Sequence, residues 1–118
     1  MSLPDRPERD ADIGAQISYL ATSEGGRVHA AHSGYRPTHD FGLGYLSDAH
    51  HYYPNGPIAP GQTGEALLWF LNATVHEQRL FPGFQFTVQE GGRLVGSGVV
   101  TRVLDQRLQK PDIPPGPG

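Results

Sequence analysis

The sequence contains no cysteine, a single lysine and no long apolar run in its 118 residues. Without cysteine the chain has no disulfide, no thiolate nucleophile and no cysteine-ligated zinc. The single lysine, Lys110, precedes Pro111, so the Gly-Lys-Ser/Thr phosphate loop is excluded and we expect no GTP binding. No run of about 18 apolar residues is present and the start has no apolar signal-peptide core, so we expect no membrane span and a cytoplasmic location.

Glycine and proline are abundant, with 16 and 11 residues, and this favours turns over long helices. The hydrophobic fraction of 36% and the charged fraction of 18% suit one globular domain of ordinary size. Residues 1–12 are acidic and poor in large apolar side chains, so we expect a disordered N-terminal tail. Residues 105–118 are expected to be a Pro/Gly-rich C-terminal tail, which leaves residues 13–104 as the folded part.

Apolar residues recur with period two across residues 13–104, which is the pattern of strands with one buried face. The expected inward faces are Ile13, Ala15, Ile17 and Tyr19; Phe84, Phe86 and Val88; and Val95, Ser97, Val99, Thr101 and Val103. Residues 66–71 are apolar throughout but too tightly flanked by turns for a helix, so we expect a fully buried strand. Six or seven short strands predict an all-β fold, a small closed barrel or sandwich.

The unit Glu-Gly-Gly-Arg occurs twice, at residues 24–27 and 90–93. A Gly-Gly pair supplies the positive φ angles that a two-residue hairpin turn requires. The sequence therefore predicts two hairpins, near residues 13–33 and 84–104. Glycines 96 and 98 on the last strand predict sharp curvature or close approach of a neighbouring backbone.

Six histidines raise the hypothesis of a histidine-dependent metal- or ligand-binding protein. Its candidate ligands are His29 and His32, three apart, and the adjacent His50 and His51. Residues three apart on a strand face opposite ways, so surface histidines are the simpler interpretation. The sequence holds no complete nucleophile or zinc-protease motif, and we expect a non-enzyme with no cofactor.

Arginine is the remaining candidate for binding. Arg27 and Arg93 follow the two Gly-Gly turns, and Arg36 lies in the Gly-Tyr-Arg-Pro segment 34–37. A guanidinium group suits two-pronged contacts to phosphate or carboxylate. The net charge of −3 argues against strong binding to nucleic acid.

Taken together, residues 24–27, 34–37, 60–61 and 83–104 resemble the C-terminal domain (domain III) of translation elongation factor Tu. The last segment, Gly-Phe-Gln-Phe-Thr-Val-Gln-Glu-Gly-Gly-Arg-Leu-Val-Gly-Ser-Gly-Val-Val-Thr-Arg-Val-Leu, carries most of the resemblance. The resemblance as a whole covers about residues 13–104, and it implies a closed six-stranded antiparallel β-barrel. One departure is the stretch 38–48, where the family's Phe-Arg-Thr-Thr-Asp-Val-Thr-Gly run is missing and Gly42 replaces its arginine.

In the family this barrel contacts the T stem of aminoacyl-tRNA through the two Glu-Gly-Gly-Arg turns and also packs on translation proteins. The resemblance therefore implies a stand-alone, non-catalytic binding module without GTPase activity. Its partner would be tRNA, bound weakly, or a translation-related protein, and a homodimer paired through exposed strand edges is a further expectation. The site residues that it implies, together with the arginines named above, are Arg27, Arg36, Glu90, Gly91 and Arg93.

Overall fold

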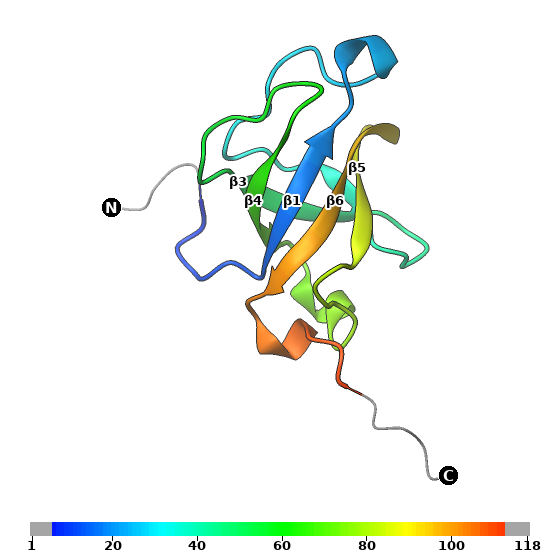
Figure 1. The fold of residues 1–118 in the computed structure, drawn as a ribbon. Coiled ribbons are helices and arrows are strands. Elements are labelled where there is room, and N and C mark those ends of the chain that lie inside the picture. Colours follow the sequence, from blue (N-terminus) through cyan, green and yellow to red (C-terminus); the bar gives the residue numbers. More distant parts are fainter. Residues whose placement is uncertain (1–5, 113–118) are drawn as a thin grey trace.

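The computed structural model describes residues 6–112, and these fold into six strands and three short 3₁₀ helices (Figure 1). Residues 1–5 and 113–118, the outer parts of the two expected tails, lie outside the described residues. In chain order the elements are β1 (Ile13–Tyr19), η1 (Thr22–Glu24), β2 (Thr38–Asp40), β3 (Ser47–Tyr52), β4 (Thr63–Phe70), η2 (Ala73–His76), β5 (Gln85–Glu90), β6 (Arg93–Val103) and η3 (Gln106–Leu108).

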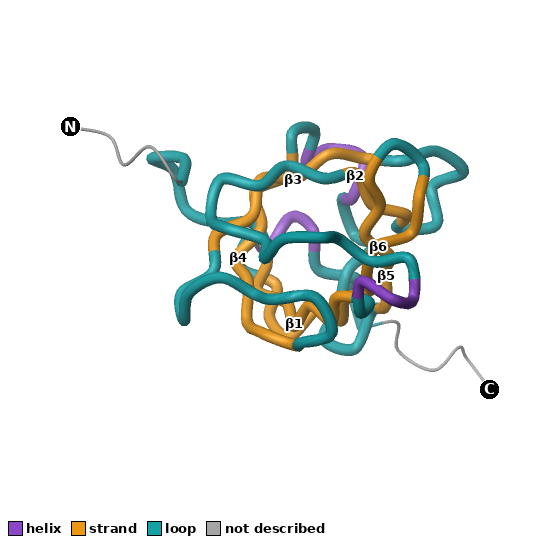
Figure 2. The backbone as a smooth tube through the Cα atoms, turned by 90° about the horizontal axis from the view of Figure 1, so that it is seen from above, coloured by secondary structure: helices purple, strands orange, loops and turns teal. Residues whose placement is uncertain are grey.

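The strands form a closed barrel in the order β1-β4-β3-β2-β5-β6, with β6 pairing back onto β1. Every pairing between these strands is antiparallel, and Figure 2 shows the ring from above. The predicted closed six-stranded antiparallel β-barrel is confirmed. Each of the six strands is paired on both sides, so the barrel formed by the described residues has no free strand edge through which the expected homodimer could pair.

The barrel interior is filled by the inward side chains of the strands. On β1 the predicted face is confirmed, with Ile13, Ala15 and Ile17 fully buried. On β5, Phe86 and Val88 are buried as expected. The apolar segment 66–71 lies in strand β4 up to Phe70, and its Trp69 is covered on the outer face. The expectation that the whole segment is buried is wrong at Leu67, which is half-buried, and at Leu71, which is 75% exposed beyond the end of the strand. Within residues 6–112, no helix has the length and apolar character to cross a membrane.

The predicted inward face of β6 is wrong over much of its length. Ser97 and Thr101 are exposed, whereas Gly98 and Val100 lie on the buried side. The reason is a register shift against each neighbouring strand, opposite Val88 on β5 and near the start of β1, since a bulge reverses the alternation of faces. The predicted close approach of a neighbouring backbone is confirmed at Gly96, where a Cβ atom would lie 2.8 Å from the carbonyl oxygen of Ser18. At Gly98 the close neighbour is a side chain, since a Cβ atom there would lie 2.2 Å from Cζ of Phe86.

Of the two predicted hairpins, one is present. Gly91 and Gly92, with φ angles of 55° and 80°, form the two-residue turn between β5 and β6. The hairpin predicted over residues 13–33 is wrong, since β1 pairs with β4 and β6. Here the second glycine, Gly26, donates its N–H to the carbonyl of Ala21 (3.0 Å). This hydrogen bond closes a short local loop. The chain that follows the loop then crosses the end of the barrel.

Both flanks of the barrel extend into ranges expected to be tails. Asp12 is 1% exposed, and its carboxylate accepts hydrogen bonds from Arg9 and from the Phe70 N–H. Trp69 donates its indole N–H to the Arg9 carbonyl (2.7 Å). At the other flank Leu108 is fully buried. The folded region is therefore longer than residues 13–104, because a few polar bonds and one leucine hold segments of low hydrophobicity.

Candidate functional site

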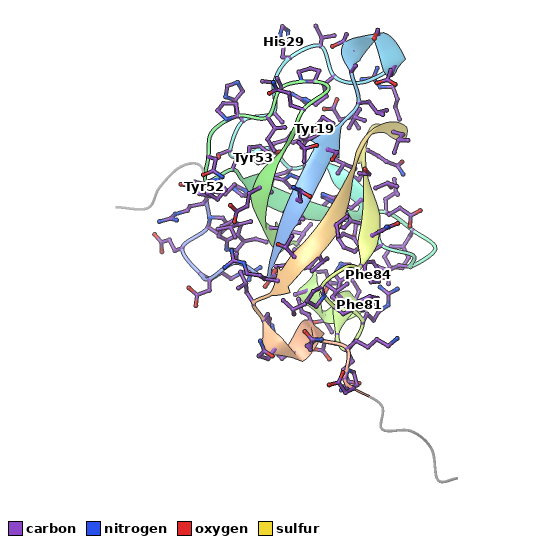
Figure 3. The ribbon with its side chains drawn as sticks, in the orientation of Figure 1. Tyr19, His29, Tyr52, Tyr53, Phe81 and Phe84 are labelled. Carbon is purple, nitrogen blue, oxygen red and sulfur yellow. The ribbon has the colours of Figure 1, made fainter. Side chains whose placement is uncertain are left out.

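One end of the barrel carries an ion-pair cluster built from three separate segments. Arg27 follows η1, Tyr35 precedes β2, and Glu90 ends β5. The Arg27 guanidinium and the Tyr35 hydroxyl both donate to Oε1 of Glu90. The guanidinium carbon of Arg27 lies 4.4 Å from the centre of the Tyr35 ring, and its Nε donates to the carbonyl of His29 (3.2 Å). Arg27 is thus held by an aromatic ring, a carboxylate and a backbone oxygen. His29, which supplies the backbone oxygen, is labelled at this end of the barrel in Figure 3.

The cluster is charged at neutral pH. Burial raises the pKa of the Glu90 carboxyl, but the Tyr35 hydrogen bond and the Arg27 charge lower it by more, so its pKa lies below the ordinary value. Burial lowers the pKa of Arg27, and the Tyr35 and Glu90 contacts more than offset this, so the net shift is upward. Burial and the bond to Glu90 raise the pKa of Tyr35, which stays a neutral donor.

The available cation at this end is Arg93 rather than Arg27. The Arg93 side chain is 58% exposed and its Nη2 lies 4.0 Å from Oε2 of Glu90, whereas the Arg27 side chain is 20% exposed. Gly91 and Gly92 form an exposed turn directly beside Arg93. Arg27, Glu90, Gly91 and Arg93 are therefore brought together.

Arg36, the fifth predicted site residue, lies elsewhere. Its exposed side chain lines a 440 Å³ surface hollow with His50 and Trp69, and the lining contains no residue of the Arg27–Glu90 cluster. Arg36 follows Tyr35 directly in the chain, and adjacent residues in an extended segment point to opposite sides. Sequence proximity to Tyr35 therefore did not place it in the site.

The four candidate metal ligands do not converge. His29 and His32 are exposed, and the His50 ring packs edge-on against Trp69 at 5.9 Å, whereas His51 is fully buried inside the barrel. Among residues 6–112, no three histidine, aspartate or glutamate side chains are grouped so that they could hold a metal ion.

A buried chain of hydrogen bonds runs through the barrel interior, and sequence reasoning missed it. Nε2 of His39 lies 2.7 Å from Nε2 of His51, and Nδ1 of His51 lies 3.0 Å from the Tyr53 hydroxyl. That hydroxyl lies 2.7 Å from the hydroxyl of Tyr19, and Figure 3 labels both tyrosines. At the other end Nδ1 of His39 lies 3.0 Å from the Ser47 carbonyl. The sequence does hold one indication that His51 is buried. It alternates with the apolar residues Ala49 and Tyr53, two residues away on either side, and residues at this spacing share one face of a strand.

The direction of this chain is fixed by its last acceptor. The Ser47 carbonyl can only accept, so His39 carries its proton on Nδ1, and its Nε2 accepts from His51. His51 must then accept at Nδ1 from Tyr53, and Tyr53 accepts from Tyr19. Burial lowers the pKa of His39 to about 4 and that of His51 well below its ordinary value. The chain is neutral and fully bonded, and it offers no exposed acid or base to a substrate.

His76 at the opposite end of the barrel is buried without such bonds. Its ring stacks on Phe70 at 4.0 Å and meets Phe41 at 4.9 Å, and neither ring nitrogen has a hydrogen-bond partner among the described residues. Burial lowers its pKa to about 4. A buried polar group without a partner costs about 1–3 kcal/mol. His76→Phe is therefore expected to raise the free energy of unfolding by about 1 kcal/mol in urea denaturation at pH 7.

The matched comparison for His76→Phe is the same substitution at His51. His51→Phe removes the middle of the bonded chain and leaves Nε2 of His39 without a donor and the Tyr53 O–H without an acceptor, so it is expected to lower the free energy of unfolding. Equal destabilisation by both variants would contradict the assignment of His76 as unpartnered.

The two groups of polar side chains differ in what they can do. The cluster of Arg27, Tyr35, Glu90 and Arg93 is partly exposed and charged, and the interior chain is buried and neutral. No known protein-family model matches the sequence. The resemblance to elongation factor Tu domain III stays a prediction carried by the residues quoted for it.

Proposed function

We propose that this protein is a non-catalytic binding module that binds an RNA backbone, weakly, through the barrel end formed by Arg27, Tyr35, Glu90, Gly91 and Arg93. The observation that supports it is the convergence of three segments, around residues 27, 35 and 90–93, on one ion pair. Three of these residues, Arg27, Glu90 and Gly91, are the positions through which the resemblance implies contact with the T stem of tRNA. Such a module is expected to act in the cytoplasm.

Phosphate is the ligand chemistry that fits this end best. Arg93 offers an exposed guanidinium group beside the exposed Gly91–Gly92 turn, and guanidinium and backbone N–H groups both suit phosphate oxygens. Glu90 neutralises the charge of Arg27, and the chain carries a net charge of −3. Both features keep the affinity low, and the contact of Arg93 with phosphate makes it depend on salt.

Arg93→Ala is expected to weaken the binding of aminoacyl-tRNA about fivefold at low salt and to reduce the salt slope of log K by about 1, since one phosphate contact is lost. Fluorescence titration at several salt concentrations measures both quantities. Arg27→Ala is expected to weaken binding as well, because Glu90 then loses its half-buried partner and pairs with Arg93 instead.

The matched control is Arg102→Ala. Arg102 lies on the same strand as Arg93, and its side chain is 56% exposed against 58%, but it pairs with Glu65 at 3.7 Å on another face. Equal losses for Arg93→Ala and Arg102→Ala, or no tRNA binding by the wild type at low salt, would overturn the proposal. If the wild type binds a protein partner and Arg93→Ala does not, the ligand of this surface is an acidic protein and not RNA.

A further inference from the structure

The interior hydrogen-bond chain meets the surface cluster at Tyr35. The backbone N–H of His51 donates to the Tyr35 carbonyl (2.8 Å), and the Gly34 N–H donates to the His51 carbonyl (2.9 Å). The Tyr35 ring also packs edge-on against the His51 imidazole, with centroids 5.8 Å apart and an interplanar angle of 73°. The centroid of the Tyr19 ring lies 6.4 Å from that of the Tyr35 ring. Tyr35 is therefore seated on the chain through both its backbone and its ring.

On its outer side Tyr35 holds the ion pair. Its hydroxyl donates to Glu90, and the Arg27 guanidinium lies over its ring. Glu90 thus receives two donors on one oxygen, and its second oxygen faces Arg93 at 4.0 Å. With Arg27 and Tyr35 saturating one oxygen, Glu90 interacts only loosely with Arg93.

The interior supplies a rigid support for this arrangement. His51 is fixed on both ring nitrogens, by Tyr53 and by His39. A fully bonded buried ring has one orientation, because any rotation breaks a hydrogen bond that no water replaces. The seat of Tyr35 is therefore fixed before any ligand arrives.

We propose that Tyr35 and His51 are positioning residues of the binding surface: His51 seats Tyr35, and Tyr35 holds the Glu90–Arg27 pair so that Arg93 stays available to the ligand. The part of this inference that concerns ligand affinity rests on the proposed function. The physical gain is preorganisation, since a side chain already held in its bound orientation loses less conformational freedom on binding.

The test uses two hydroxyl deletions in the full-length chain. Tyr35→Phe keeps the ring that supports Arg27 and packs on His51 but removes the donor to Glu90. Tyr53→Phe removes a hydrogen bond to His51 from a buried residue whose hydroxyl bonds to His51 and Tyr19 and not to Arg27 or Glu90. Tyr52→Phe is the control, because Tyr52 lies on the same strand as His51 but faces outward, with Arg6 over its ring.

The first readout is the NMR signal of the Arg27 Nε–H group, which needs no ligand. We expect slow exchange with solvent in the wild type and in Tyr52→Phe, and faster exchange in both Tyr35→Phe and Tyr53→Phe. The second readout is tRNA affinity, expected to fall about fivefold in Tyr35→Phe for the loss of one ordering hydrogen bond. A merely structural role would lower the unfolding midpoint and leave the Arg27 signal of the folded protein unchanged.

The two readouts separate the two proposals. If the wild type binds no tRNA while Arg27 responds to Tyr35→Phe and Tyr53→Phe, the proposed function is overturned and the positioning role stands. If the Arg27 signal in both variants matches that of the wild type, the positioning role is overturned, whatever the affinity. A response to Tyr35→Phe alone restricts the positioning role to Tyr35 and removes His51 from it.

Discussion

Acidification from pH 7 to pH 5 is expected to lower the free energy of unfolding by several kcal/mol. Three histidines, His39, His51 and His76, are fully buried. Burial lowers the pKa of His39 and of His76 to about 4 and that of His51 well below its ordinary value. In the unfolded chain the same imidazoles titrate near pH 6.5.

The sign follows from proton uptake. Between pH 6.5 and pH 4 the unfolded chain binds protons that the folded protein refuses, so its relative free energy falls as the pH falls. For His39 alone this amounts to about 2 kcal/mol at pH 5. The stability that these histidines contribute is fully present above pH 6.5 and is lost on the way to pH 4. A small domain is stable by about 5–15 kcal/mol in total, so unfolding within this window is expected.

Urea denaturation at pH 7, 6 and 5 measures this loss. Glu90 does not account for it, because its carboxyl, with a pKa below 4.5, contributes stability that is lost only at lower pH. His32→Gln is the matched control, since His32 is exposed, and its pH dependence is expected to equal that of the wild type. His76→Phe is expected to flatten the dependence. A free energy of unfolding that stays constant from pH 7 to pH 5 would contradict the burial of neutral histidines.

Gly26→Ala is expected to destabilise the barrel by about 3 kcal/mol, because the new methyl group has no space. Its Cβ atom would lie 2.1 Å from the carbonyl oxygen of Leu20 and 2.8 Å from that of Ala21. Both are backbone atoms, and the Gly26 N–H bond to Ala21 fixes the loop against them. Relief of the clash therefore has to move the chain that leads from β1 to Arg27.

The neighbouring glycine provides the control. A Cβ atom on Gly25 meets nothing within 4 Å, but its φ of 92° is unfavourable for other residues, so Gly25→Ala is expected to cost about 1 kcal/mol. Urea denaturation of the two variants at pH 7 compares them directly. A larger loss for Gly25→Ala than for Gly26→Ala would show that backbone conformation, and not space, requires the Gly-Gly pair at residues 25–26.

Sequence patterns predicted the fold where alternation was uninterrupted. The faces of β1 and β5 and the Gly91–Gly92 turn depend on local chemistry and were predicted correctly. The face of β6 was predicted incorrectly, because bulges depend on how the strand pairs with β1 and β5, which the strand's own residues do not reveal. The first Glu-Gly-Gly-Arg unit forms no hairpin for a similar reason: β1 pairs with β4 and β6, which are remote from it in the sequence.

The candidate site was predictable only in part. The resemblance and the hairpin rule led to Arg27, Glu90 and Arg93, and the structure brings them together. Tyr35 entered sequence reasoning only as the tyrosine of the Gly-Tyr-Arg-Pro segment at residues 34–37. The pair His39 and His51 could not be found from spacing, because the strands β2 and β3 bring them together across a connecting loop.

The one-way order of the interior chain limits how the sequence of this protein can drift. At position 51 a side chain must accept on one atom and donate from another across the width of a ring, and among uncharged side chains only histidine does so with this shape. At position 52, the next residue along the strand, the Tyr52 side chain faces outward with Arg6 over its ring and is not a link in this chain. Neighbouring positions on one strand should therefore differ sharply in mutational tolerance, and the less tolerant one is the one that a surface view would never show.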